Sequence, residues 1–128
     1  MFDEEKKKKL VETYVQAYNR FDVARMLSVL HDRIVFENVS NGEVTLEIKG
    51  IEAFKEQAEQ AAKIFTERTQ KIEDFAFSAD GCEVNIDYRG TIAADLPNGL
   101  KAGDRIKLKG KSIFRFADGK ISEIRDIS

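Results

Sequence analysis

The chain has 128 residues and a hydrophobic fraction of 42%, which is the size of one domain with enough apolar side chains for a core. Its 21 basic and 23 acidic residues give a net charge of −2, and this balance excludes the basic field typical of nucleic-acid-binding proteins. No apolar run approaches the roughly 18 residues of a membrane span. We therefore expect a single domain over residues 1–128 that binds neither nucleic acid nor a membrane.

The first residues, MFDEEKKKKL, are followed by no apolar signal-peptide core, which predicts a cytoplasmic protein. Cys82 is the only cysteine and His31 the only histidine, so an intrachain disulfide and a cysteine- or histidine-rich zinc site are both excluded by count. His31 lies in VLHDR, at the expected end of a helix, where a cation suits the helix dipole. We expect no metal and no cofactor.

Two helices are predicted at the start of the chain, over residues 3–18 and 22–30. The first presents an apolar stripe at helical spacing, formed by Val11, Tyr14, Val15 and Tyr18. Its lysine run, residues 6–9, is expected to be a solvated first turn with favourable i,i+4 pairs to preceding glutamates. Asp22 is the expected N-cap of the second helix.

A strand is predicted from Ile34, and it ends in the turn composition NVSNG at residues 38–42. Alternating Val44, Leu46 and Ile48 then predict a short hairpin arm. A third helix is expected over residues 51–67, with an apolar face that includes Phe54 and Phe65.

The rest of the chain predicts antiparallel strands over residues 70–78, 83–93, 105–116 and 121–127, with Asp80-Gly81 as a hairpin turn. Alternation directs one set of side chains toward the helices, including Val84, Ile86, Tyr88, Leu108, Ser112 and Phe114. Charged residues such as Lys107 and Lys109 fall on the opposite, solvated face. Helices followed by hairpin-connected strands predict an α+β fold.

Three segments in this order, YVQAYNRFDVARMLSVLHDRIVFEN, KGIEAFKEQ and GKSIFRFADGKISEIRDIS, resemble the nuclear transport factor 2-like superfamily. Ketosteroid isomerases and SnoaL-like polyketide cyclases share this fold. The resemblance covers nearly the whole chain. It implies a cystatin-like cone, in which a curved antiparallel or mixed sheet wraps around three helices from the N-terminal half. It also implies a small apolar ligand in the cone, and together with Ile113, isolated among charges on the outer face, it implies a homodimer.

The resemblance transfers only some catalytic residues. Tyr14 matches the tyrosine with which ketosteroid isomerases donate a hydrogen bond to a substrate oxyanion. Their general base is matched by Asn38, whose amide cannot accept a proton at neutral pH, and their second oxyanion donor is matched by Ser112. Asp126 matches the acid/base aspartate that SnoaL-like cyclases place on the last strand, but their partner histidine also falls at Ser112.

Limonene epoxide hydrolases also place an aspartate at the position of Asp126. Their arginine is matched by Arg89, and Thr91 then replaces their second aspartate, so that the triad is incomplete. The alternation also turns Arg89 away from the side of Tyr88.

Asp126 and Tyr14 are thus the expected catalytic residues, and the expected substrate contacts are Asn38, Ser112, Tyr88, Phe54 and Phe114. An aspartate inside an apolar cone would have its pKa raised toward general acid or base work. The alternatives are that Asp126 pairs with a basic neighbour or lies in water, and that Tyr14 is a core residue. Two function classes remain open: an isomerase-, cyclase- or hydrolase-like enzyme, or a non-catalytic ligand-binding or dimerisation module.

Overall fold

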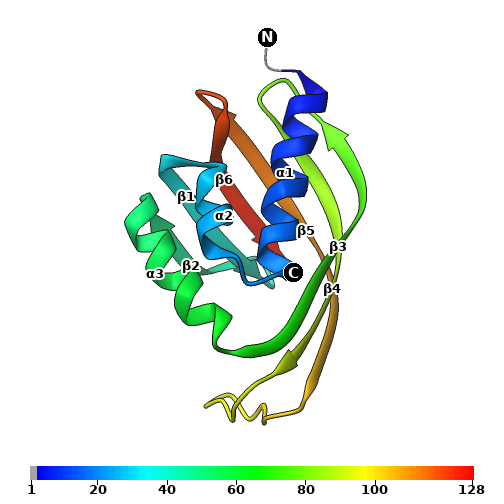
Figure 1. Ribbon diagram of the computed structural model, residues 1–128. Coiled ribbons are helices and arrows are strands. Elements are labelled where there is room, and N and C mark those ends of the chain that lie inside the picture. Colours follow the sequence, from blue (N-terminus) through cyan, green and yellow to red (C-terminus); the bar gives the residue numbers. More distant parts are fainter. Residues whose placement is uncertain (1–2) are drawn as a thin grey trace.

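The computed structural model describes residues 3–128, which form three helices and six strands (Figure 1). In chain order these are α1 (Glu4–Asn19), α2 (Val23–Ser28), β1 (Leu30–Ser40), β2 (Glu43–Lys49), α3 (Ile51–Ala62), β3 (Phe65–Phe77), β4 (Gly81–Ile92), β5 (Arg105–Ala117) and β6 (Lys120–Ile127).

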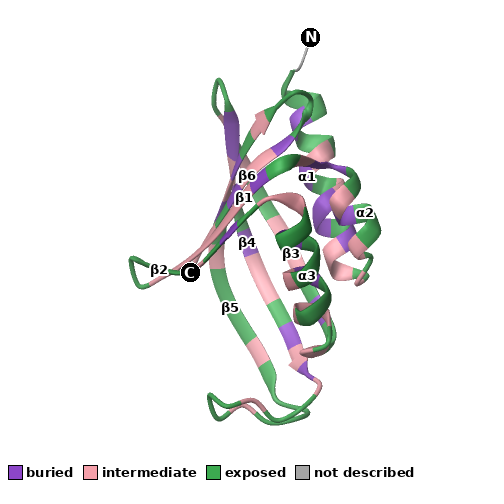
Figure 2. Cartoon of the chain, turned by 90° about the vertical axis from the view of Figure 1, so that its left-hand side faces the viewer, coloured by how far each residue is buried: buried purple, intermediate pink, exposed green. Residues whose placement is uncertain are grey.

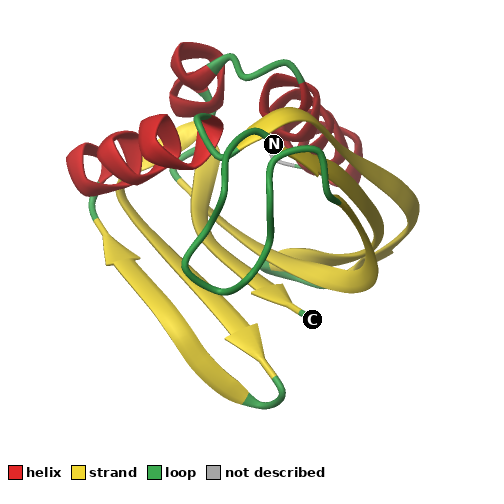
Figure 3. Cartoon of the chain, turned by 90° about the horizontal axis from the view of Figure 1, so that it is seen from below, coloured by secondary structure: helices red, strands yellow, loops and turns green. Residues whose placement is uncertain are grey.

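All six strands form one sheet in the order β2-β1-β6-β5-β4-β3. Every neighbouring pair is antiparallel except β1 and β6, which run parallel, so the sheet is mixed. Figure 2 shows the three helices on one side of the sheet, and Figure 3 shows from below how the strands curve around beneath them. The predicted α+β cone, with a curved mixed sheet around three helices, is confirmed.

Aspartate side chains cap the N-termini of the first two helices. Asp3 accepts a hydrogen bond from the backbone N–H of Lys6 at 3.0 Å, and Asp22 accepts one from Arg25 at 3.1 Å. The predicted N-cap at Asp22 is therefore confirmed. Between these helices Phe21 adopts a left-handed backbone conformation, with φ 59°, which turns the chain sharply from α1 to α2.

The core lies between the helices and the concave face of the sheet. Its most deeply buried side chains come from helix α1 and four strands, β1, β4, β5 and β6: Val11, Ile34, Val84, Ile92, Phe114, Ile121 and Ile124. Cys82 is also buried here as a free thiol, and burial raises its pKa to about 11. The predicted strand faces are correct, since Val84 and Ile86 are buried while Lys107 and Lys109 are exposed.

Leu108 departs from this pattern, because it is 42% exposed although it lies on the inward face. It lines the cavity described below.

Two predicted helix ends are wrong. Helix α3 ends at Ala62 instead of residue 67, and Phe65 begins strand β3, which starts five residues earlier than expected. Phe65 and Thr66 favour extended backbone, and the pairing of Phe65 with Ile92 of β4 overrides the helical periodicity. His31 is likewise the second residue of β1 and not a helix end; its Nε2 lies 2.9 Å from Oδ2 of Asp118.

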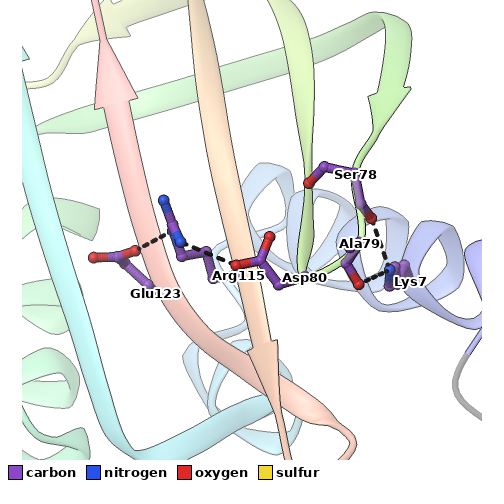
Figure 4. Close-up of polar contacts among 6 residues, drawn as sticks. All are labelled: Lys7, Ser78, Ala79, Asp80, Arg115 and Glu123. Atoms are coloured by element: carbon purple, nitrogen blue, oxygen red, sulfur yellow. Dashed lines mark hydrogen bonds and ion pairs between the residues drawn. The ribbon is translucent and has the colours of Figure 1, made fainter.

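The predicted solvated lysine run is wrong for one of its members. Lys7 is only 6% exposed, and its Nζ donates hydrogen bonds of 3.1 Å to the backbone carbonyls of Ser78 and Ala79. Figure 4 shows these contacts at the turn between β3 and β4, where Arg115 also bridges Asp80 and Glu123. Lys7 thus joins the first turn of α1 to a hairpin more than 70 residues away in sequence.

We expect Lys7→Met to destabilise the protein by about 1–3 kcal/mol, because two partly buried hydrogen bonds from a charged donor are lost. The matched control is Lys9→Met, which removes the same charge from an exposed position in the same helical turn. Urea unfolding followed by circular dichroism measures both changes. Equal free energies of unfolding for the two variants would contradict the anchoring role of Lys7.

Candidate active site

A cavity of about 430 Å³ lies between the concave face of the sheet and the helices. Its walls are mostly apolar, with side chains that include Met26, Phe36, Ile48, Phe54 and Ile86. Both the size and the apolar lining are typical of sites for small organic molecules. A small number of polar groups enter this lining, and they decide what the cavity can do.

Asp126 enters the cavity from the last strand. In the sheet it lies opposite Ser112 of β5 and beside Asn38 of β1. Ser112 is 4% exposed, and its hydroxyl donates a 2.6 Å hydrogen bond to Oδ1 of Asp126. Burial raises the pKa of Asp126 to about 6, and the hydrogen bond from Ser112 opposes part of that increase. Ser112 therefore orients the carboxyl.

No basic side chain among residues 3–128 forms an ion pair with Asp126. The neighbouring Arg125 instead pairs with Glu37, at 3.0 Å. Without a cation beside it, the Asp126 carboxylate loses hydration that no opposite charge replaces, which is the physical cause of its raised pKa.

Tyr14 reaches the cavity from helix α1. Its ring packs against Phe54 and Phe114, at centroid distances of 6.4 and 6.1 Å. Its hydroxyl makes no hydrogen bond to any residue from 3 to 128. Burial, and next the nearby charge of Asp126, raise its pKa well above the usual value, so the phenol stays protonated. Phe54 lines the cavity, whereas Phe114 lies behind it as a core residue that is 1% exposed.

Asn38 lies at the cavity wall, where β1 pairs with both β6 and β2. Its Nδ2 donates a 2.8 Å hydrogen bond to Oγ1 of Thr45, which donates in turn to the backbone carbonyl of Asn38 at 3.2 Å. Strand β2 therefore fixes the amide of Asn38.

Two further tyrosines form a hydroxyl pair in the cavity wall. The hydroxyls of Tyr18 and Tyr88 are 2.9 Å apart, and burial raises the pKa of both phenols. The alternation of residues in β4 predicts that Tyr88 points inward and contacts a substrate. Tyr18 was placed only in the apolar stripe, although its position four residues after Tyr14 puts it on the same helix face.

Arg68 is a cavity residue that sequence analysis missed. It lies on β3, is only 3% exposed, and donates from Nε to the carbonyl of Tyr18 at 2.8 Å. The carbon of its guanidinium lies 3.6 Å from the centre of the Tyr18 ring and 4.5 Å from that of Phe21. A correct start for β3 would have revealed it, because Arg68 and Gln70 then share one strand face.

The residues matched to limonene epoxide hydrolases lie elsewhere. Arg89 is exposed and 3.7 Å from Asp87, while Thr91 donates to Glu67 at 3.2 Å. Neither lines the cavity that contains Asp126.

Residues 3–128 contain neither a metal-binding cluster of side chains nor a membrane-spanning helix. This part of the chain contains no group of three or more His, Cys, Asp and Glu side chains arranged to hold a metal ion. None of its helices is both long enough and apolar enough to cross a membrane.

Known structures share this architecture at low sequence identity. An LEH-like epoxide hydrolase from M. tuberculosis is 18% identical with a TM-score of 0.77, and the match covers 96% of this chain and 82% of the hydrolase chain. A proposed polyketide cyclase from Xanthomonas campestris pv. campestris is 20% identical with a TM-score of 0.76, over 97% and 90%. A cystatin-fold protein from Novosphingobium aromaticivorans is 16% identical with a TM-score of 0.73, over 94% and 96%.

No curated protein matches the sequence. The family model that matches is that of the SnoaL-like domain, over residues 11–124, which is most of the chain. The protein therefore belongs to the SnoaL-like family of the nuclear transport factor 2-like superfamily.

Proposed function

We propose that the protein binds a small, largely apolar molecule in its cone and transfers a proton to or from it through Asp126. The observation that carries this proposal is a carboxyl group in an apolar cavity. This carboxyl has no cationic partner among residues 3–128, and its pKa is raised to about 6. A base with a pKa near the working pH is suited to general acid–base catalysis.

The groups around Asp126 suggest how the proton would move. Because Ser112 engages Oδ1, Oδ2 is the oxygen that would accept a proton from a carbon next to a substrate carbonyl. The protonated hydroxyl of Tyr14 would donate to the carbonyl oxygen as that oxygen gains negative charge. Asn38 would help to position the substrate at the same end of the cavity.

The relatives suggest two chemistries, cyclisation of polyketides and hydrolysis of epoxides. The site favours proton transfer at carbon, as in an isomerase or a cyclase, over epoxide hydrolysis, because Arg89 and Thr91 lie outside the cavity. Ser112 in place of the histidine of the cyclases favours the alternative, a non-catalytic ligand-binding or dimerisation module. The next two predictions separate these functions.

We expect the Asp126 carboxyl to titrate near pH 6 in NMR spectra of the free protein. Since its pKa is raised in the folded state, ionisation opposes folding, and stability falls as the pH rises from about 4 through 6. Asp126→Asn should therefore have a higher free energy of unfolding in urea than wild type at pH 7, by at most about 3 kcal/mol. At pH 3 the two free energies of unfolding should be equal. The exposed Asp32→Asn is the control. A pKa at or below 3.8 would remove the proposed base.

Proton transfer is measured directly as deuterium incorporation from D₂O into 2-tetralone, a flat apolar ketone with exchangeable hydrogens beside its carbonyl. We expect wild type to accelerate exchange, Asp126→Asn to abolish the acceleration, and Tyr14→Phe to reduce it by about 10- to 100-fold. NMR line broadening of the ketone confirms that each variant still binds it. Binding by wild type without faster exchange would instead support the non-catalytic module.

The homodimer and the cytoplasmic location expected from the sequence remain predictions. We infer that the dimer forms through the outer sheet face or the edge strands β2 and β3, since Ile113 lies half-buried among charged residues on that face. Multi-angle light scattering should give twice the chain mass at micromolar concentration, and Ile113→Lys should lower the measured mass toward that of one chain. A monomer at every concentration would refute the dimer.

A further inference from the structure

Arg68 is a buried cation on strand β3, and no carboxylate in the described part of the chain pairs with it. It is 3% exposed, and among residues 3–128 no aspartate or glutamate forms an ion pair with it. Its Nε donates to the backbone carbonyl of Tyr18, but Nη2 is buried and has no hydrogen-bond partner within residues 3–128. Buried arginines are normally paired, because removing the charge from water is costly. The unsatisfied hydrogen-bonding capacity of the Arg68 guanidinium therefore needs an explanation.

The surroundings of Arg68 hold its guanidinium at the cavity wall. It stacks on the ring of Tyr18 on helix α1, and the left-handed turn at Phe21 brings a second ring to 4.5 Å. Stacking on two rings and the Nε hydrogen bond leave only the terminal nitrogens for further contacts. Such a planar, immobilised donor matches the geometry of a carboxylate or a similar delocalised oxyanion.

Arg68 and Asp126 act on the same group of tyrosines with opposite signs. The charge of Arg68 lowers the pKa of Tyr14, Tyr18 and Tyr88, whereas the charge of Asp126 raises it. Strands β5 and β4 separate Asp126 on β6 from Arg68 on β3, so the cavity has a negative and a positive side, with Tyr88 on β4 between them. Lys111 also borders the cavity, but its Nζ is 2.9 Å from Glu83.

We propose that the cavity selects ligands that carry an oxyanion, a carboxylate or an ionised enol or phenol, which binds to the guanidinium of Arg68 at the cavity wall. This inference rests on the proposed function and adds the substrate class: a flat, largely apolar molecule with its anionic group toward Arg68. Repulsion by Asp126 enforces this orientation and leaves the uncharged, reactive end of the ligand toward Asp126 and Tyr14.

The test compares two probes of equal shape, 2-naphthoate and 2-naphthamide, by isothermal titration calorimetry at pH 7.5. Wild type should bind the carboxylate about ten-fold more tightly than the amide. Arg68→Met should remove this preference. The matched control Arg89→Met, which removes an exposed arginine, should keep it.

A third probe distinguishes the two kinds of oxyanion. The fluorescence of 7-hydroxycoumarin reports ionisation of its phenol, which should occur at lower pH on wild type than free in solution, and not on Arg68→Met. If wild type prefers the carboxylate but leaves the coumarin pKa unchanged, the natural ligands are carboxylates. If only the coumarin pKa shifts, they are enols or phenols. Either result supports recognition of an oxyanion by Arg68.

A purely structural role for Arg68 gives different results. Arg68→Met would then lose stability, but wild type itself would bind naphthoate and naphthamide equally and leave the coumarin pKa unchanged, which overturns the inference even if the variant fails to fold. That outcome leaves the two predictions of the proposed function unaffected: the titration of Asp126 near pH 6 and deuterium exchange into 2-tetralone. If none of the probes and no 2-tetralone binds, the proposed function fails as well.

Discussion

The insertion of strand β6 between β1 and β5 is the constraint on which the rest of the structure depends. The hairpin β1–β2 and the meander β3–β4–β5 are each local in sequence, and β6 alone joins them into one sheet. Its residues Ile121 and Ile124 are fully buried, so the same strand closes the core. This insertion also sets Asp126 between Asn38 and Ser112, which are more than 70 residues apart in the chain. The fold and the candidate site are therefore completed by one strand.

Sequence patterns predicted the parts of this structure in which local and tertiary preferences agree. Alternation on β4 and β5 gave the correct inward faces, and the stripe on α1 correctly included Tyr14. The errors occur where packing overrides local preference: Phe65 extends β3 against helical periodicity, and Lys7 is buried by carbonyls of a distant hairpin. Arg68 could not be found because its inward direction follows from that misplaced strand start, and its stacking depends on the turn at Phe21.

Tyr18 connects the two charged sides of the cavity to the scaffold. Its carbonyl accepts from Arg68, its ring supports the guanidinium, and its hydroxyl contacts that of Tyr88. One residue near the end of helix α1 therefore fixes both the buried cation and the phenol pair. Asp126 is fixed independently by Ser112 on the opposite side. Because the two charges have separate supports, the affinity for an anionic group and the basicity of the carboxyl can change independently by mutation.

Cys82, the single buried thiol, gives the molecule an internal reporter of local opening. It lies at the start of β4, beside the turn whose carbonyls bind Lys7. With a pKa of about 11, almost none of this thiol is ionised at neutral pH, and protein atoms cover it. A disulfide reagent can react only when this end of the sheet opens and exposes the thiol, so the labelling rate under native conditions measures how often that end of the cone opens. Wild-type protein suffices for this measurement, because no other cysteine competes.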